Sequence, residues 1–388
     1  MDYAFEQSLP IVSLLCSPGV SVKEGIESGL FYTNVINKNI LYSGKVPQIA
    51  VVMGMTMGAP AYSATLMDFV LFNKSRSTLM VTGPNVIKEV MGENSSPKEL
   101  GGSNLHSEVT GIVDCVDKNI TEQLETLKRL LEILPQSSQH SPANRLSFTP
   151  RDSLPIIPEN SKSPFNMMLA IKAITDNSEI FEIKASYGKS IITGFSYIGG
   201  MLVGIMANQS LELSGAIDCD ASRKASRFLR LCNSYNVPIL NLIDVPGFMP
   251  GKEQESNGLL RYGAQLCMGL QTSMTRMSIV IRRAYGAAAY ILIQSKNKGG
   301  SLSVALKNSK IAIMGYEAAE KMVYKDSNVQ DQKENEKNYY NEYEDPKLSL
   351  KAGLIDDIID IAEARETIIK TLNKKKNIVS DFKERIFP

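Results

Sequence analysis

One pattern constrains the fold more than any other, because it occurs once in each half of the chain. An apolar strand leads into a turn of glycine and alanine, and a helix follows. In the first half the apolar run 47–53 precedes a turn at residues 54–61, and in the second half residues 279–296 contain the turn 285–289. Repeated strand–turn–helix units favour parallel strands with right-handed crossovers. We therefore expect an α/β protein with an approximate internal duplication.

A segment without hydrophobic periodicity separates the two halves. Residues 135–164 are rich in serine, proline and asparagine and follow a long amphipathic helix predicted for residues 118–134. This composition is typical of a domain boundary, and 388 residues exceed one ordinary core. We predict two domains, residues 1–150 and residues 151–388.

Shorter patterns predict individual elements. A helix is expected at residues 61–69, directly after the first turn, and a strand at residues 79–82. Alternation around two glycines predicts a hairpin at residues 189–208. Asp220 is expected to cap the helix that follows.

Composition argues against several classes of function. The net charge of +1 provides no overall field for nucleic acid or membrane binding, and no apolar run approaches a membrane span. Five scattered cysteines without a CxxC pair, and no secretory signal pattern, favour a cytoplasmic protein with reduced thiols. His106 and His140 are the only histidines, which argues against a histidine-based metal site or a Ser-His triad. We expect no metal.

The glycine–alanine turns suggest a chemistry. Such turns let the backbone approach a ligand closely, and adjacent amides at a helix start stabilise a developing oxyanion, such as a thioester enolate. The alternative is that small residues only allow close packing of helix against strand. A third ligand-facing element is residues 240–264, where a strand runs into the rigid turn Asp244–Gly247 at an expected sheet edge. Asp244 is predicted to be a buried, turn-fixing carboxylate rather than a catalytic base.

Nine ordered motifs extend over nearly the whole chain. They are residues 17–25, 47–66, 82–84, 99–111, 194–209, 244–264, 282–289, 310–315 and 352–357. The most specific is the sequence DVPGF-x-PG with its downstream glycine and arginine. Together the motifs resemble the carboxyltransferase (beta) subunit of biotin-dependent acyl-CoA carboxylases, of the propionyl-CoA carboxylase beta type.

The resemblance implies two crotonase-like (ClpP/crotonase superfamily) domains in tandem, each a spiral of ββα units, that face each other across a dimer. Acyl-CoA would lie on the N-terminal domain of one subunit and carboxybiotin on the C-terminal domain of another. Biotin carboxylase and a biotin carboxyl carrier protein are the implied partners, and a ring of dimers the implied homo-oligomer. The family carries a long segment before the motif at Ser17, so this first domain is expected to be shortened, with a separate N-terminal carboxyltransferase half as a further candidate partner.

The resemblance also implies the site residues. Amides of Gly58 and Ala59 would hold the thioester oxygen, and those of Ala287 and Ala288, or of Ala288 and Ala289, the ureido oxygen of biotin. The choice stays open because the second turn is one residue longer than the family's. Further residues implied around the substrates are Gly54, Tyr62, Gly83, Gly247, Phe248, Gly286, Tyr290 and Ile291.

The implied reaction moves a carboxyl group between carboxybiotin and the α-carbon of a short acyl-CoA, through an enolate that backbone amides stabilise. Two other hypotheses keep the fold. One is a decarboxylase or an enzyme acting on acyl thioesters of a carrier protein, and the other is a non-catalytic partner subunit.

Overall fold

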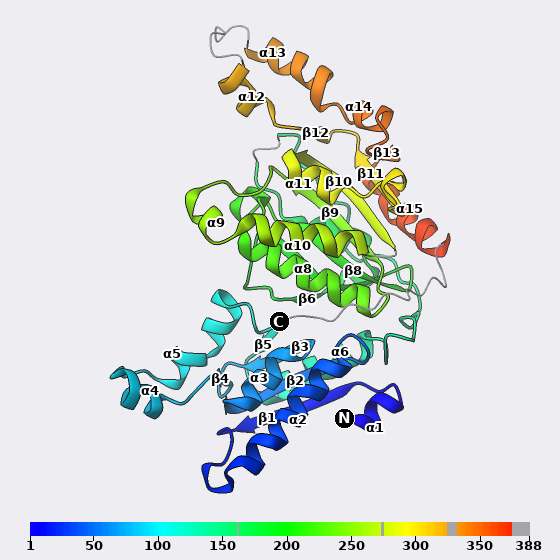
Figure 1. Cartoon of the computed structure of the whole chain (residues 1–388). Coiled ribbons are helices and arrows are strands. Elements are labelled where there is room, and N and C mark those ends of the chain that lie inside the picture. The colour runs from blue at the N-terminus through cyan, green and yellow to red at the C-terminus, as the bar shows by residue number, and fades with distance from the viewer. Residues whose placement is uncertain (161–162, 273–274, 324–331, 375–388) are drawn as a thin grey trace.

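The computed structural model describes residues 1–160, 163–272, 275–323 and 332–374 (Figure 1). Its strands form two sheets, one from each half of the sequence. In Figure 1 the first half lies below, in blue and cyan, and the second half lies above, in green to red. This arrangement matches the α/β architecture and the duplication expected from the sequence.

The first sheet has five strands, all paired in parallel, in the order β1-β2-β3-β5 with β4 beside the end of β2. A parallel sheet needs strands that are apolar on both faces, and β3 is buried at every residue. The strands are β1 Ile11–Ser17, β2 Gln48–Met57, β3 Phe69–Asn73, β4 Thr78–Met80 and β5 Cys115–Asp117. The helices are α1 Asp2–Glu6, α2 Ile26–Tyr42, α3 Ala59–Leu66, α4 Pro84–Met91, α5 Pro97–Gly101 and α6 Ile120–Ile133.

The second sheet has eight strands in the order β13-β11-β10-β9-β8-β7-β6, with β12 beside β10. In the described part of the chain, the β6–β7 and β7–β8 pairs of this sheet are antiparallel and the others parallel. The strands are β6 Phe181–Ile183, β7 Ile191–Ile198, β8 Met201–Asn208, β9 Ile239–Val245, β10 Arg276–Tyr285, β11 Leu302–Leu306, β12 Lys310–Ala312 and β13 Asp357–Ile359. The helices are α7 Met167–Ile174, α8 Cys219–Ser234, α9 Lys252–Ser256, α10 Leu259–Thr272, α11 Gly286–Leu292, α12 Tyr316–Val323, α13 Gln332–Tyr339, α14 Pro346–Lys351 and α15 Ile361–Lys374.

The two halves share one hydrophobic core. The rings of Phe69 and Phe195, one from each half, have centroids 6.5 Å apart. The hydroxyl of Tyr235 on the second half donates to the carboxyl of Asp68 on the first at 2.6 Å. The predicted division after residue 150 falls between the two sheets, and it stays a prediction because the core does not break there.

Most predicted elements are confirmed, including the hairpin of β7 and β8. Two predictions are wrong. The helix expected at residues 61–69 ends at Leu66, and Phe69 instead begins β3, because a continuous apolar run does not distinguish helix from buried strand. Asp220 does not cap α8, because Asp218 occupies that position and accepts from the N–H of Ala221 at 2.7 Å.

Candidate active site

The turn in the first half joins β2 to α3 through Gly58. Its φ is +69°, a value that glycine adopts readily and other residues avoid. The carbonyl of Gly58 accepts from the N–H groups of Ala61 and Tyr62 at 2.9 and 3.2 Å. Pro60 lies in the first turn of α3, where its missing N–H costs nothing. The motif therefore builds a tight helix start beginning at Ala59.

Only one of the two donors predicted in this turn is available. The N–H of Gly58 donates to the carbonyl of Met80 at 3.0 Å, so its assignment as an oxyanion donor is corrected. The N–H of Ala59 has no protein acceptor within the described part of the chain, as expected for the first residue of a helix. The positive end of the helix dipole lies at the same point and favours an anion there.

The turn in the second half, between β10 and α11, repeats this geometry. Gly286 has φ +64° and stands where Gly58 stands in the first turn. Residues 58–62 and 286–290 then show a similar order of exposure, with two buried residues before a tyrosine that is 53% exposed in one and 42% in the other; they differ at the second residue, where Ala59 is half-buried and Ala287 is exposed. The structure thus aligns Ala59 with Ala287, an equivalence that the extra residue obscured in the sequence.

This alignment favours one of the predicted donors of the second turn. Ala288 and Ala289 are fully buried, because α11 turns both into the core. Ala287 is exposed, and no acceptor is recorded for its N–H among the described residues. Exposure therefore favours Ala287 as a donor, and the predicted pairs that contain Ala288 and Ala289 stay predictions.

Two predicted glycines have clear packing roles beside the first turn. A Cβ on the first, Gly83, would lie 3.2 Å from Sδ of Met57, the residue before the turn. Gly19, which is not among the predicted residues, packs there too, since a Cβ on it would lie 3.2 Å from the Met57 carbonyl. Gly54 is not in the turn, because β2 continues to Met57. A Cβ there would lie 2.6 Å from Sγ of Cys16, so Gly54 allows close packing between strands.

Asp244 is confirmed as a buried carboxylate that fixes the end of β9. Its Oδ2 accepts from Nη2 and Nε of Arg282 at 2.7 and 3.0 Å, and both side chains are almost fully buried. Arg283 approaches Oδ1 at 3.5 Å. With two guanidinium groups around it, this carboxylate is structural and not a free base.

The loop after Asp244 is held by backbone contacts to the strand-like bridge at Ile217. Ile217 donates to the carbonyl of Gly247 at 3.1 Å and accepts from Met249 at 2.9 Å. The ring of Phe248 would lie 3.4 Å from a Cβ on Gly263, so α10 packs closely against it. Gly247 and Phe248 thus lie together, on the second-half side predicted for biotin.

The remaining predicted residues of this side adjoin α11. The ring of Tyr290 lies under Nζ of Lys298 at 5.8 Å, and Ile291 is partly buried against the core. The turns at Gly58 and Gly286 are not brought together within one chain, because α8 and α10 lie between α3 and α11 (Figure 1). One chain therefore presents two separate helix-start sites.

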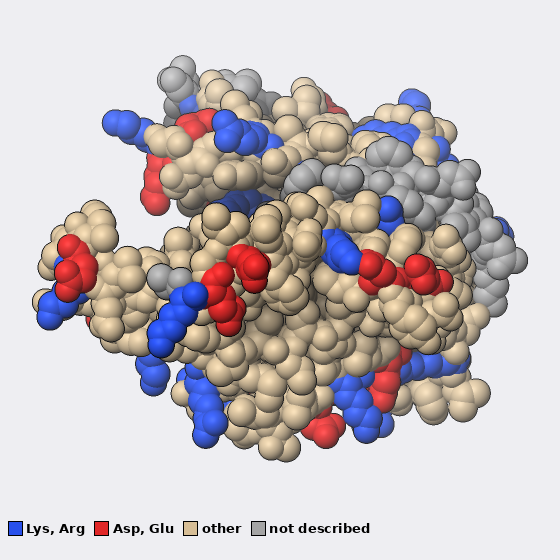
Figure 2. Space-filling view, turned by 60° about the horizontal axis from the view of Figure 1, so that its bottom comes forward, with Lys and Arg blue, Asp and Glu red and all other residues tan. Residues whose placement is uncertain are grey.

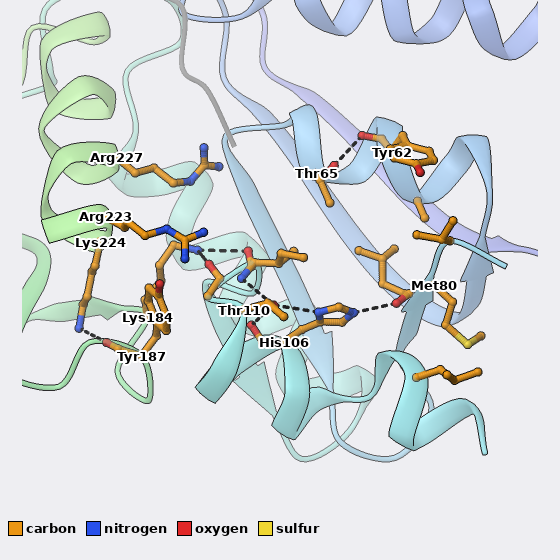
Figure 3. A pocket seen from close by; sticks show the side chains of 16 residues that line it. Tyr62, Thr65, Met80, His106, Thr110, Lys184, Tyr187, Arg223, Lys224 and Arg227 are labelled. Atoms are coloured by element: carbon orange, nitrogen blue, oxygen red, sulfur yellow. Dashed lines mark hydrogen bonds between the residues drawn. The ribbon is translucent and has the colours of Figure 1, made fainter. Parts of the chain in front are cut away.

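A pocket of about 490 Å³ opens beside the first turn, between the two halves (Figure 3). Met80, whose carbonyl accepts from Gly58, lines it, so one end of the pocket adjoins the turn. Its lining is Ala61, Tyr62, Thr65, Leu79, Met80, Val81, Leu100, His106, Thr110, Gly111, Ile112, Lys184, Tyr187, Arg223, Lys224 and Arg227. A volume of this size is usual for a small-molecule site.

Two lysines of the second half form the buried part of the pocket wall. Nζ of Lys184 donates to the carbonyls of Gly111 and Ile112 and lies 3.1 Å from Oδ1 of Asp114. Lys224 is 2% exposed and donates to the backbone carbonyls of Tyr187 and Ile191, at 2.9 and 2.7 Å. Burial lowers the pKa of both lysines, that of Lys224 to about 7.

Two arginines on the same face of α8 complete the wall. Arg227 donates through Nη2 to two backbone carbonyls between α3 and β3, at 2.9 and 3.0 Å. Arg223 is exposed, lies 3.9 Å from a carboxylate oxygen of Asp220, and stacks over the ring of Tyr262 at 5.3 Å. In Figure 3 both arginines face α3 across the pocket.

His106 is a fixed part of the opposite wall. Its Nε2 lies 2.7 Å from the carbonyl of Leu79 and its Nδ1 lies 2.9 Å from the hydroxyl of Thr110. A carbonyl only accepts, so Nε2 carries the proton and Nδ1 accepts from Thr110. Burial lowers the pKa of His106, which keeps the ring neutral near pH 7. Both nitrogens are engaged, so His106 positions the wall and is not a free base.

Sequence reasoning identified one residue of this pocket, Tyr62. It missed the four basic side chains of the wall, because Lys184, Arg223, Lys224 and Arg227 lie far along the chain from the turn that they face. The one available signal was the spacing of Arg223 and Arg227, which places both on one face of a helix.

Surface charge and composition add limited constraints. Basic and acidic residues alternate over the face shown in Figure 2, with no broad region of one sign. Among the described residues, no helix combines the length and apolarity needed to cross a membrane. Within the same residues, no group of three or more His, Cys, Asp or Glu side chains is arranged to hold a metal ion.

Comparison with known proteins identifies close relatives over the whole chain. A model of the carboxyl transferase domain family matches residues 1–386. A propionyl-CoA carboxylase beta chain of Cereibacter sphaeroides is 35% identical over 386 residues, which cover 97% of this chain and 75% of that protein. A methylmalonyl-CoA decarboxylase subunit alpha of Propionigenium modestum is 31% identical over 388 residues, 96% of this chain and 74% of that protein.

Solved structures give the same result. Transcarboxylase 12S, described as a hexamer with methylmalonyl-CoA and methylmalonic acid bound, superposes with a TM-score of 0.91 at 31% identity. The superposition covers 100% of this chain and 77% of that one. The crotonase-like fold expected from the sequence is thereby confirmed.

Proposed function

The chain belongs to the carboxyl transferase domain family, whose relatives here are carboxyltransferase enzymes, and we propose that it moves a carboxyl group between carboxybiotin and the α-carbon of a short acyl-CoA. Propionyl-CoA and methylmalonyl-CoA are the first substrates to test, because the relatives and the transcarboxylase structure are named for them. One observation carries the proposal. The chain builds the same glycine–alanine helix start twice, and within the described residues no protein acceptor is recorded for the backbone N–H of Ala59 or of Ala287.

These two amides suit a reaction that develops charge on two oxygens. The N–H of Ala59 would donate to the thioester oxygen as the α-carbon loses its proton, and the dipole of α3 would stabilise the resulting enolate. The N–H of Ala287 would hold the ureido oxygen of the biotin ring. Biotin, carried on a separate carrier protein and loaded by a biotin carboxylase, would supply the carboxyl group and accept the α-proton.

The separation of the two turns supports a site shared between two copies of the chain. One subunit would contribute the turn at Gly58 and another the turn at Gly286, since one chain keeps them apart. The hexamer described for transcarboxylase 12S supports an assembly of this kind. A homo-oligomer of dimers is therefore part of the proposal.

A second candidate function is decarboxylation of the same class of thioester. It is favoured by the relative named as a methylmalonyl-CoA decarboxylase subunit. The same two amides would serve it, because loss of carbon dioxide also passes through an enolate. The two functions differ in where the carboxyl group goes.

The direct test is turnover of methylmalonyl-CoA by the purified protein with and without free biotin, followed by mass spectrometry of the thioester. Propionyl-CoA formed only with biotin, together with carboxylated biotin, supports carboxyl transfer. Propionyl-CoA formed equally without biotin favours decarboxylation. No turnover of methylmalonyl-, malonyl- or propionyl-CoA, even with carboxylated carrier protein, contradicts both functions.

The shared site has its own test. Ala59→Pro and Ala287→Pro each remove one N–H at a helix start that tolerates proline, and each follows a glycine that avoids the usual clash. Loss of an oxyanion donor lowers kcat by about 10²–10³. Ala59→Gly and Ala287→Gly keep the N–H and serve as controls. Random pairing of the two proline variants in dimers should restore about one quarter of wild-type activity, because mixed dimers have one intact site. A mixture as inactive as each variant alone contradicts a site shared between subunits.

A further inference from the structure

The pocket beside α3 is divided into two chemically different ends. The end that adjoins the first turn is apolar, with Ala61, Met80 and Val81 in its wall. The opposite end carries four basic side chains from the second half, namely Lys184, Arg223, Lys224 and Arg227. Figure 3 shows these side chains on the side of the pocket away from Tyr62 and Met80. A molecule that extends from the turn into the pocket would thus meet cations at its far end.

Among the described residues, no carboxylate lines this pocket. Carboxylates lie behind its wall, where Asp114 pairs with Lys184, Glu182 interacts with Lys224, and Asp220 accepts from the hydroxyl of Tyr187 at 2.6 Å. Arg227 donates to two backbone carbonyls, which orient the guanidinium, and its charge also acts on the buried carboxylate of Asp68. The lasting charge at this end is carried by the two arginines, because arginine holds its charge at every physiological pH.

Arg223 is the member of the group best placed to bind a ligand directly. Its side chain is about half exposed, and its ion pair with Asp220 is long, at 3.9 Å. Cζ of Arg223 lies over the ring of Tyr262, 5.3 Å from its centroid, and this contact restrains the guanidinium. A planar, oriented guanidinium binds a carboxylate through two parallel hydrogen bonds.

The size of the pocket also exceeds what a propionyl group needs. At roughly 30 Å³ for each water-sized group, 490 Å³ holds more than ten non-hydrogen atoms. A propionyl group has three carbons. An acyl chain that fills the pocket is longer, and its far end lies among the cations.

We propose that the basic end of this pocket, with Arg223 as its principal donor, is a subsite for a carboxylate at the far end of the acyl group. The acyl thioesters that this chain accepts then include those of dicarboxylic acids, with glutaryl-CoA as the simplest probe. This inference rests on the proposed function, because it places the thioester at Ala59. The reaction is unchanged: the carboxyl group leaves carboxybiotin for the α-carbon, the α-proton passes to biotin, and the far carboxylate takes no part in bond making.

The test compares the binding of two thioesters that differ in the far carboxylate. Dissociation constants of glutaryl-CoA and pentanoyl-CoA are measured by titration calorimetry with the full chain, with Arg223→Gln, and with Arg76→Gln, an exposed arginine outside the pocket. We expect glutaryl-CoA to bind the full chain about tenfold more tightly, as one charge-assisted bond allows. Arg223→Gln should abolish that ratio and Arg76→Gln should leave it unchanged, with thermal unfolding confirming that both variants fold.

Three results overturn the inference. Equal dissociation constants of glutaryl-CoA and pentanoyl-CoA in the full chain mean that no site binds the far carboxylate. Equal weakening of both thioesters by Arg223→Gln means that Arg223 binds a phosphate of CoA, which the two share. A ratio that survives Arg223→Gln removes Arg223 from the site. Because binding is measured without turnover, failure of the inference is separate from failure of carboxyl transfer, which the methylmalonyl-CoA assay reports.

Discussion

Substitution of Lys184 by methionine tests how the two halves are held together. Lys184 follows β6 in the second sheet, yet its Nζ bonds to the carbonyls of Gly111 and Ile112 and to the carboxylate of Asp114 in the first half. The side chains of Lys184 and Asp114 are 4% and 3% exposed. Methionine fills a similar volume without a charge, so Asp114 would keep a buried negative charge with no cation beside it.

The expected cost follows from that burial. Removal of one member of a buried ion pair costs about 3–5 kcal/mol, because the remaining charge stays desolvated. At about 2.1 cal/mol/K per residue, a loss of about 4 kcal/mol lowers the Tm of 388 residues by about 5 °C. Differential scanning calorimetry measures this shift. Lys189→Met, an exposed lysine five residues along, is the matched control and should change Tm little.

A second variant makes the reasoning refutable. The double variant Lys184→Met, Asp114→Asn removes the uncompensated charge. In the structure the N–H of Val70 donates to Oδ2 of Asp114 at 2.8 Å, and the amide oxygen of the introduced asparagine would still accept that bond. About half of the lost stability should return. The argument fails if Lys184→Met costs under about 1 kcal/mol, or if the double variant is no more stable than the single one.

Three further substitutions test separate features. Burial raises the pKa of Asp68 from 3.8 to about 6, so between about pH 4 and 6 the folded state holds a proton that the unfolded state has lost. The free energy of unfolding therefore falls as pH rises through this range, by on the order of 3 kcal/mol. Asp68→Asn should remove that fall in urea titrations at several pH values, and an unchanged dependence on pH would contradict the assignment. Gly54→Ala should cost about 1 kcal/mol through its contact with Sγ of the exposed Cys16, and Cys16→Ala should restore the stability of the double variant. Activity that stays low after this rescue would show that Gly54 also contacts substrate. Arg282→Lys should cost about 2 kcal/mol in denaturant unfolding, since lysine cannot reproduce the paired bonds to Asp244, and equal stability would refute a structural role for those bonds.

Features set by local sequence were predictable. The strand, turn and helix around Gly58 and around Gly286 follow from an apolar run, a glycine and a helical pattern. Asp244 was predictable as a buried carboxylate because it ends a continuous apolar strand before a Pro-Gly turn. In each case the determining residues are neighbours in the chain.

Features set by distant contacts were not predictable. The N–H of Gly58 is occupied by a carbonyl on β4, and this pairing depends on how β2 and β4 lie in the sheet. The burial of Ala288 and Ala289 depends on how α11 packs, which a run of three alanines leaves undetermined. The cations of the pocket meet the first turn only because the two halves share a core.

The basic end of the pocket combines two roles that constrain one another. Lys184, Lys224 and Arg227 donate to backbone carbonyls or to a buried carboxylate, so a change at any of them alters how the wall is held as well as its charge. Arg223 makes no recorded bond of that kind in the described residues and lies at the exposed edge of α8. Substitution there changes the charge that a ligand meets and leaves the junction between the halves intact. If the pocket selects acyl groups by their far end, Arg223 is therefore the position at which that selectivity can change at the least cost in stability.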